Sequence, residues 1–184
     1  MGLALLATLV VVGVYVVVGF NGLTRLRLLA DNAWSDIDVQ LKRRHDLIPS
    51  LVATVQGHAG YEQSTLDAVV SARNRALAAS GPASMAPAEA DIAGAVKRIL
   101  ALAEAYPDLK AGESFLALQR SLTEIEEQVQ QARRYYNAVV RDLNTSVAQF
   151  PSNLIAGVFR IQPREFFGLD TPAEGAAPRI ALDP

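Results

Sequence analysis

The 184-residue chain contains no cysteine and has only two histidines, His45 and His58. Disulfides and thiolate metal sites are therefore excluded. The two histidines stand on opposite sides of Pro49 and do not form the one-turn His pair of a helical zinc motif. A structural zinc site usually needs four ligands, so we expect neither a metal nor another cofactor in this chain.

Aromatic residues and excess positive charge are also scarce. Phe, Trp and Tyr make up 7% of the sequence, the formal net charge is −2 and the pI is about 5.7. Nucleic-acid-binding domains usually present a basic surface, often with aromatic side chains on which bases stack. We therefore expect no nucleic-acid partner.

The sequence lacks a recognisable catalytic constellation. Asp36 and Asp38 are two residues apart, so on a helix their side chains point about 200° away from each other and are poorly placed as an acid–base pair. No serine has a histidine at a suggestive spacing, and no glycine-rich loop could hold a phosphate. These absences predict a protein that is not an enzyme.

Charge is absent from one long segment, Leu3 to Phe20. As a helix these roughly 18 residues would extend about 27 Å, enough to cross a thin bilayer core. A cleaved signal peptide is the alternative, but no basic residue precedes Leu3, and the stretch from Phe20 to Leu23 is a poor cleavage site. We therefore predict an uncleaved transmembrane anchor.

The positive charges nearest this segment follow it. Arg25 and Arg27 come soon after Phe20, whereas no Lys or Arg precedes Leu3. The positive-inside rule then places the N-terminus outside and the remainder of the chain in the cytoplasm, as a single-pass protein of a bacterial cell membrane. Arg25 and Arg27 are the predicted contacts to lipid headgroups.

Apolar residues recur at helical spacing after the anchor, through residues 23–59. Neither Gly nor Pro occurs between Leu23 and Ile48, so the helix of the anchor can continue into this region. Pro49 lacks an N–H and predicts a kink or a break, and Asp46, just ahead of Pro49, could cap a restarted helix.

Two further helices are predicted over 62–79 and from about 89 to 106, with a loop over 80–88 that contains Gly81-Pro82 and Pro87. The last helix carries the most regular pattern in the chain, because its apolar residues alternate steps of three and four and form a heptad seam of the coiled-coil type. The seam consists of Phe115, Leu118, Leu122, Ile125, Val129, Ala132, Tyr136, Val139 and Leu143.

Long amphipathic helices joined by short loops predict antiparallel packing. The expected fold class is all-α, with an N-terminal transmembrane helix that continues into an antiparallel three- or four-helix bundle. We place the anchor at residues 1–22, the bundle domain at 23–168 and a disordered tail, rich in Ala, Pro and Gly, at 169–184.

The basic cluster Lys42-Arg43-Arg44 is the most distinctive charged feature. On a continuous helix it would lie roughly 30–35 Å beyond the membrane, several Debye lengths away, so attraction to lipid headgroups would be screened. Its side chains are then either solvated or in contact with acids of the bundle or of a partner. The candidate interaction surface consists of Trp34, Asp36, Asp38, Lys42, Arg43 and Arg44.

Trp34 and Tyr136 permit a second hypothesis, a pocket for a small ligand or lipid inside the bundle. Packing in the core, with the Tyr136 hydroxyl bonded to a neighbouring helix, explains the same aromatic residues more simply.

Several motifs together resemble the LemA family. They are AWSDIDVQLKRR at 33–44 followed by DLIP at 46–49, then Tyr106-Pro107, Tyr136-Asn137, and FPSNLIA at 150–156. The resemblance implies a single-pass membrane protein with a short external N-terminus, a cytoplasmic helical bundle and no catalytic residue. It also implies gene neighbourhoods with a membrane zinc protease and, for one class of members, magnetosome membranes.

The sequence thus favours a non-enzymatic, membrane-anchored scaffold or adaptor that holds a protein partner or a second copy of itself. The alternatives are a small-ligand or lipid-sensing module and an accessory protein of a membrane zinc protease.

Overall fold

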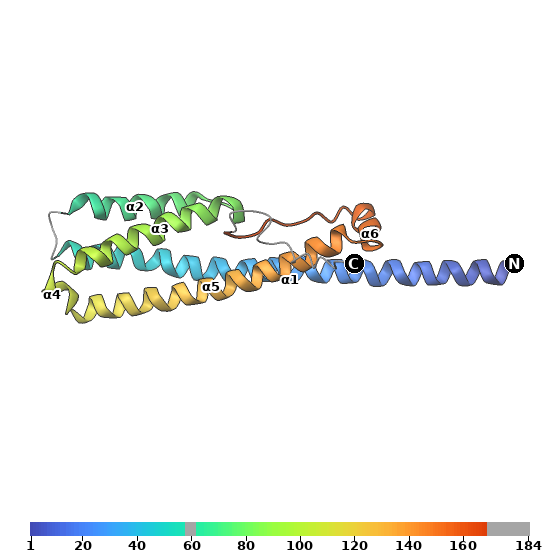
Figure 1. Cartoon of the computed structure of the whole chain (residues 1–184), viewed down its shortest axis with the longest axis horizontal. Coiled ribbons are helices and arrows are strands. Elements are labelled where there is room, and N and C mark those ends of the chain that lie inside the picture. The colour runs from blue at the N-terminus through green and yellow to red at the C-terminus, as the bar shows by residue number, and fades with distance from the viewer. Residues whose placement is uncertain (58–61, 169–184) are drawn as a thin grey trace, which may run out of the picture. The chain divides into compact units, whose positions relative to one another are not determined.

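The computed structural model describes residues 1–57 and 62–168 (Figure 1). Within these ranges the only regular secondary structure is helical, which confirms the predicted all-α fold class. The helices are α1 (Gly2–Gln56), α2 (Gln63–Ala78), α3 (Pro82–Ala103), α4 (Pro107–Lys110), α5 (Glu113–Ala148) and α6 (Ser152–Val158). His58 and the predicted disordered tail at 169–184 lie outside the described residues.

Helix α1 continues through Pro49, so of the kink or break predicted at that residue, the break is wrong. Proline removes one backbone N–H and leaves the carbonyl of the residue four positions earlier without its helical donor. That residue is His45, and its carbonyl accepts a hydrogen bond of 2.8 Å from Nε of Arg73 on α2. The side chain of Arg73 thus replaces the missing donor, and the helix continues.

Helix α3 begins at Pro82, and the loop predicted over 80–88 is also wrong. Proline suits the first turn of a helix, where its missing N–H would have had no helical partner. The preceding Gly81 has φ of 80°, a conformation that glycine adopts without strain. Ser84 Oγ also donates to the carbonyl of Ser80 at 2.6 Å and accepts its N–H at 3.0 Å, which fixes the entry to the helix.

The chain divides into two compact units. The expected bounds of the bundle domain, 23–168, stay a prediction. We call residues 1–34 with 135–168 the anchor unit and residues 35–134 the bundle unit. Helices α1 and α5 each contribute residues to both units.

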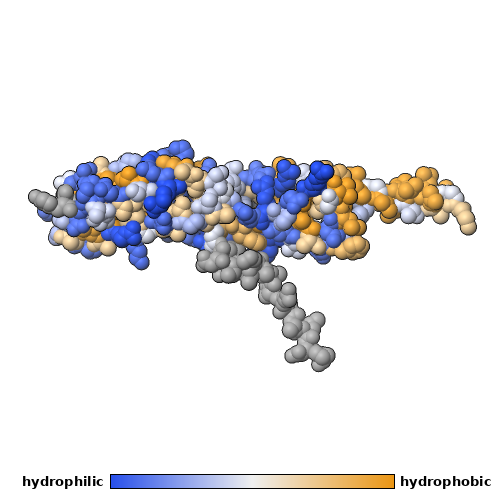
Figure 2. Space-filling model, turned by 90° about the horizontal axis from the view of Figure 1, so that it is seen from above, coloured by the Kyte–Doolittle hydropathy of each residue, from blue (hydrophilic) through white to orange (hydrophobic). Residues whose placement is uncertain are grey.

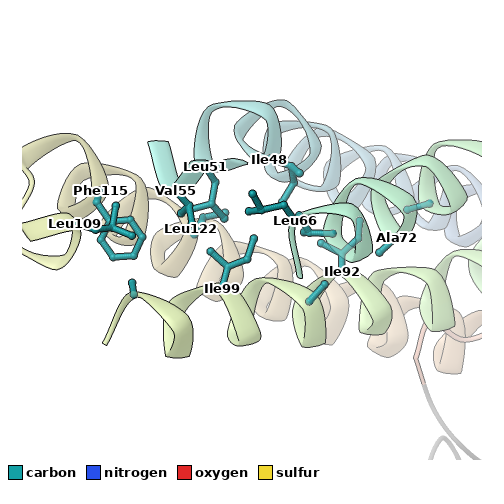
Figure 3. Packing of buried hydrophobic residues seen from close by; sticks show 14 residues of the cluster. Ile48, Leu51, Val55, Leu66, Ala72, Ile92, Ile99, Leu109, Phe115 and Leu122 are labelled. Carbon is teal, nitrogen blue, oxygen red and sulfur yellow. The ribbon is translucent and has the colours of Figure 1, made fainter. Parts of the chain in front are cut away.

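The core of the bundle unit is built by aliphatic side chains from α1, α2, α3, α4 and α5. Figure 3 shows side chains from α1, α2 and α3, including Leu51, Leu66 and Ile99, pointing toward one another. The seam predicted in α5 is largely buried across the two units, since Phe115, Leu122, Ile125, Val129, Tyr136, Val139 and Leu143 are all less than a tenth exposed. This burial explains the strict heptad spacing.

In the anchor unit, α5 holds an extended segment that follows α6, residues 161–168, which we call the strap. The Asn137 side chain donates to the carbonyl of Phe167 and accepts its N–H, at 3.1 and 2.9 Å. The Asn144 side chain does the same for Arg164, with both distances 2.8 Å. These two asparagines, two helical turns apart, satisfy strap backbone groups that are not in regular secondary structure.

Candidate functional site

Arg44 and His45 occupy core-facing positions of α1 in the bundle unit. Leu41 precedes them and Ile48 follows at steps of three and four residues, and both are buried. Helical geometry therefore directs the two polar side chains into the bundle, where Arg44 is 6% and His45 4% exposed. A buried charge requires a partner, since desolvation disfavours an isolated ion.

Glu89 of α3 supplies that partner. One carboxylate oxygen lies 2.5 Å from Nε2 of His45, and the other accepts a hydrogen bond of 3.2 Å from an Arg44 nitrogen. A second nitrogen of Arg44 contacts the carboxylate of Glu126 on α5, whose side chain is 45% exposed. With Arg73 of α2 on the carbonyl of His45, the cluster joins all four long helices of the bundle unit. We call Arg44, His45, Arg73, Glu89 and Glu126 the polar layer.

Four side chains of the polar layer, those of Arg44, His45, Glu89 and Glu126, are paired with one another. The Glu89 carboxylate is shared between Arg44 and His45, so both of its oxygens are paired inside the bundle unit. In the described part of the chain, no three His, Cys, Asp or Glu residues are grouped as metal ligands. The arrangement is suited to fixing the alignment of four helices, a role that buried ionic groups have in some bundles.

The six residues of the candidate interaction surface have different environments. Asp36, Asp38, Lys42 and Arg43 are exposed on α1 in the bundle unit. Lys42 is bonded to Asp46, one turn further along, at 2.9 Å. Arg44, by contrast, is buried in the polar layer and does not belong to the exposed surface. We call the four exposed residues the charged strip, in which Asp36 and Arg43 share one side of α1 and Asp38 and Lys42 another.

A groove adjoins the charged strip at Arg43. It has a volume of about 370 Å³ and lies between α1 and α5 within the bundle unit. Leu47 and Ile125 contribute apolar surface, and charged or polar groups surround them. The lining residues are Arg43, Asp46, Leu47, Ser121, Glu124, Ile125 and Gln128. An apolar surface with a polar rim matches the anatomy of protein interfaces.

Trp34 belongs to the anchor unit and lies in an aromatic cluster. Its ring centroid is 5.4 Å from that of Tyr136 and 5.4 Å from that of Phe167 in the strap. The Tyr136 hydroxyl donates a hydrogen bond of 2.8 Å to the carbonyl of Glu165, and burial is the main cause that raises the pKa of this phenol. The aromatic residues therefore pack on one another, as the simpler explanation expected, but the partner of the Tyr136 hydroxyl is the strap and not a neighbouring helix.

The apolar segment near the N-terminus is exposed over most of its length. Within α1 it is the one stretch in the described residues long and apolar enough to cross a membrane, and none of it is buried against protein. Figure 2 shows this part of α1 as a continuous hydrophobic surface. Arg25 and Arg27, the predicted headgroup contacts, are both exposed on the same helix after the apolar segment.

Sequence reasoning missed Arg73, Glu89 and Glu126. The signal for Arg44 and His45 was present, because their spacing from Leu41 and Ile48 places them on the core face. Pro49 also indicated that the carbonyl of His45 would need a substitute donor. Neither pattern indicates which residue of a distant helix supplies the partner.

Together these features define a helical-bundle protein with one apolar helix of membrane-spanning length and an internally paired polar layer. The chain belongs to the LemA family, whose pattern matches residues 33–182.

The curated relatives are distant. Magnetosome protein MamQ 2 and Magnetosome protein MamQ 1 of Paramagnetospirillum magneticum are each 22% identical over 159 residues, covering 72% of this chain and 58% of the relative. Protein LemA of Metamycoplasma hominis is 25% identical over 140 residues, covering 74% of this chain and 63% of the relative. The chain thus spans less than two thirds of the length of these relatives.

Proposed function

We propose that this LemA-family protein is a non-enzymatic scaffold or adaptor, anchored in a bacterial cell membrane by α1, that binds a protein partner or a second copy of itself. The exposed apolar segment supports the anchor, because about 18 apolar residues in water are strongly unfavourable and a bilayer would cover them. The relatives named as magnetosome proteins agree with a membrane-associated protein.

The observation that carries the proposal is the contrast between the charged strip with its groove and the polar layer. The most strongly buried charges of the bundle unit are paired with one another, which favours a structural role for them. The groove at Arg43, in contrast, presents an apolar base and a rim with both signs of charge to the surroundings. Such a surface suits a protein partner better than a small substrate.

Charge reversal on the strip tests this proposal. We expect Lys42→Glu with Arg43→Glu, introduced in the full chain, to reduce the partner recovered by crosslinking and co-purification from membranes. The matched control is Lys97→Glu with Arg98→Glu, which reverses two adjacent exposed charges on α3. Unchanged recovery and unchanged oligomer size in the strip variant would refute the proposed surface.

We further propose that the N-terminus is outside and the bundle unit in the cytoplasm, since Arg25 and Arg27 follow the apolar segment. The absence of cysteine allows a direct test. A single cysteine at Ser64 on α2 should resist a membrane-impermeant maleimide in intact cells and react after permeabilisation. Labelling in intact cells would show that the bundle unit is outside the cell and would contradict the proposed topology.

The alternative of a ligand-sensing pocket at Trp34 and Tyr136 is not favoured. The two rings contact each other, and the hydroxyl of Tyr136 is already bonded within the protein.

A further inference from the structure

Helix α6 lies directly against α1 at the end of the apolar segment. The rings of Phe159 and Phe20 are 4.5 Å apart between centroids. One turn earlier on α6, Ile155 packs on Gly19, where the Cβ of any other residue would overlap the Ile155 side chain. Ile155 and its neighbour Ala156 are both buried. The small helix is therefore fixed, within the anchor unit, at the level where α1 changes from apolar to polar sequence.

The other side of α6 and its flanks is apolar and uncovered. Phe150 is 74% exposed, Leu154 60%, Val158 77% and Phe159 46%. Four large apolar side chains thus lie uncovered within about ten consecutive residues, an arrangement that usually marks an interaction site.

The exposed face of α6 is continuous with the surface of α1 that the membrane would cover. Val17 and Val18, just before Gly19, are 59% and 65% exposed. Figure 2 shows the hydrophobic surface extending from the N-terminal part of α1 onto the adjoining part of the anchor unit where α6 lies. This continuity with the membrane-length segment favours lipid as the occupant of the face.

Polar residues border the face as a headgroup region would require. Arg160 directly follows Phe159 and is exposed, and Asn153 is exposed beside Leu154. Arg25 is exposed about one and a half turns beyond Phe20 on α1. Cationic side chains at this level can reach lipid phosphates while neighbouring apolar side chains enter the acyl boundary.

We propose that α6 with Phe150 and Phe159 is a membrane-interface element, which lies on the cytoplasmic boundary of the bilayer with Leu154 and Val158 inserted among the acyl chains. It would fix the depth of the anchor unit and oppose axial movement of α1. This inference rests on the proposed membrane anchor and adds a second lipid contact to it.

The test uses the full chain, which has no native cysteine, in vesicles of phosphatidylethanolamine and phosphatidylglycerol. A nitroxide is attached to one introduced cysteine at a time, at Leu154, Asn153 or Val11. Electron paramagnetic resonance then compares collision of each label with oxygen, which concentrates in the acyl region, and with a water-soluble nickel chelate. All three positions are exposed, so the labels fit without repacking the protein.

The proposal predicts that the Leu154 label collides more with oxygen than with nickel, as the Val11 label does, and that the Asn153 label shows the reverse preference. A water-exposed Leu154 label with a buried Val11 label would overturn the interface element and leave the anchor intact. A water-exposed Val11 label would overturn the anchor itself. Spin–spin broadening at Leu154 with low access to both reagents would overturn the lipid assignment in favour of a second copy.

Discussion

Arg43 and Arg44 are adjacent, carry the same charge and have opposite environments. Arg43 is exposed beside the groove, whereas Arg44 is enclosed by Glu89 and Glu126. One residue along a helix is a rotation of about 100°, which is enough to move a side chain from the surface to the core. The basic cluster was evident in the sequence. Only the spacing from Leu41 and Ile48 indicates that Arg44 faces the core and Arg43 does not.

At the residue scale, Glu89→Ala should strongly destabilise the bundle unit. It leaves Arg44 and His45 buried without their shared carboxylate, and breaking a buried ion pair on one side costs about 3–5 kcal/mol. The matched control is Asp91→Ala, which breaks an ion pair with Arg75 on the surface. The side chains of Asp91 and Arg75 are 57% and 58% exposed. Such surface pairs contribute about 0–1 kcal/mol.

Urea unfolding of the detergent-solubilised protein, followed by circular dichroism, measures both effects. Equal losses in the two variants would contradict a structural role for the polar layer.

Tyr136 provides a prediction at high pH. Burial is the main cause that raises its pKa above the ordinary value of 10.0, and the nearby Arg164 lowers it to a smaller extent. The folded chain therefore holds the phenol proton more tightly than the unfolded chain does. The resulting stabilisation is complete below pH 10 and is lost as the pH rises from there through the folded pKa.

Ultraviolet titration of tyrosinate checks this expectation. Tyr136→Phe should remove a late ionisation step, while Tyr135→Phe, which removes the exposed neighbouring phenol, should leave that step in place. If Tyr136→Phe instead removed an ionisation step with the ordinary tyrosine pKa, the phenol of Tyr136 would not be desolvated.

At the scale of the element, α1 shows why proline is an incomplete guide to helix ends. The rule that proline removes a hydrogen bond is correct here, but a side chain from α2 replaces the donor. At the start of α3 no replacement donor is needed, because the N–H that Pro82 lacks would have had no partner in the first helical turn. Local sequence could not reveal the first compensation, and the second is a standard helix-start signal.

A double-mutant cycle tests the compensation at Pro49. Arg73→Met keeps most of the side-chain stem and leaves the carbonyl of His45 without its donor, which should cost about 1–3 kcal/mol. In a Pro49→Ala background a backbone N–H becomes available to that carbonyl, so the same substitution should cost clearly less. Equal costs in both backgrounds, measured by urea unfolding, would show that Arg73 does not act through this carbonyl.

At the scale of the whole molecule, hydropathy and heptad spacing were sufficient to predict the all-α class, the long first helix and the seam of α5. They were not sufficient to predict the two units, because the boundary at residues 34 and 35 lies inside a continuous helix with no break in its pattern. Nor could they predict the strap, whose irregular backbone is held by Asn137 and Asn144 rather than by an apolar period.

The same limit applies to the exposed surfaces. The motif FPSNLIA at 150–156 contributed to the resemblance to the LemA family, but its sequence alone did not show that Ile155 is covered while Leu154 is open. The packing of α6 on Gly19 decides which face remains exposed. Which side chains remain exposed at such surfaces depends on tertiary contacts, and these cannot be predicted from one sequence.

The central claim is that the groove beside Arg43 binds a protein while α1 holds the chain in the membrane. Site-specific photocrosslinking in native membranes tests it most directly, with a photoreactive amino acid at Glu124, an exposed residue of the groove rim, or at Asn74, an exposed control on α2. The account predicts a discrete crosslinked protein or dimer at position 124, absent at 74, and lost when Lys42 and Arg43 are changed to Glu. No adduct at 124, or an adduct insensitive to those changes, would contradict it.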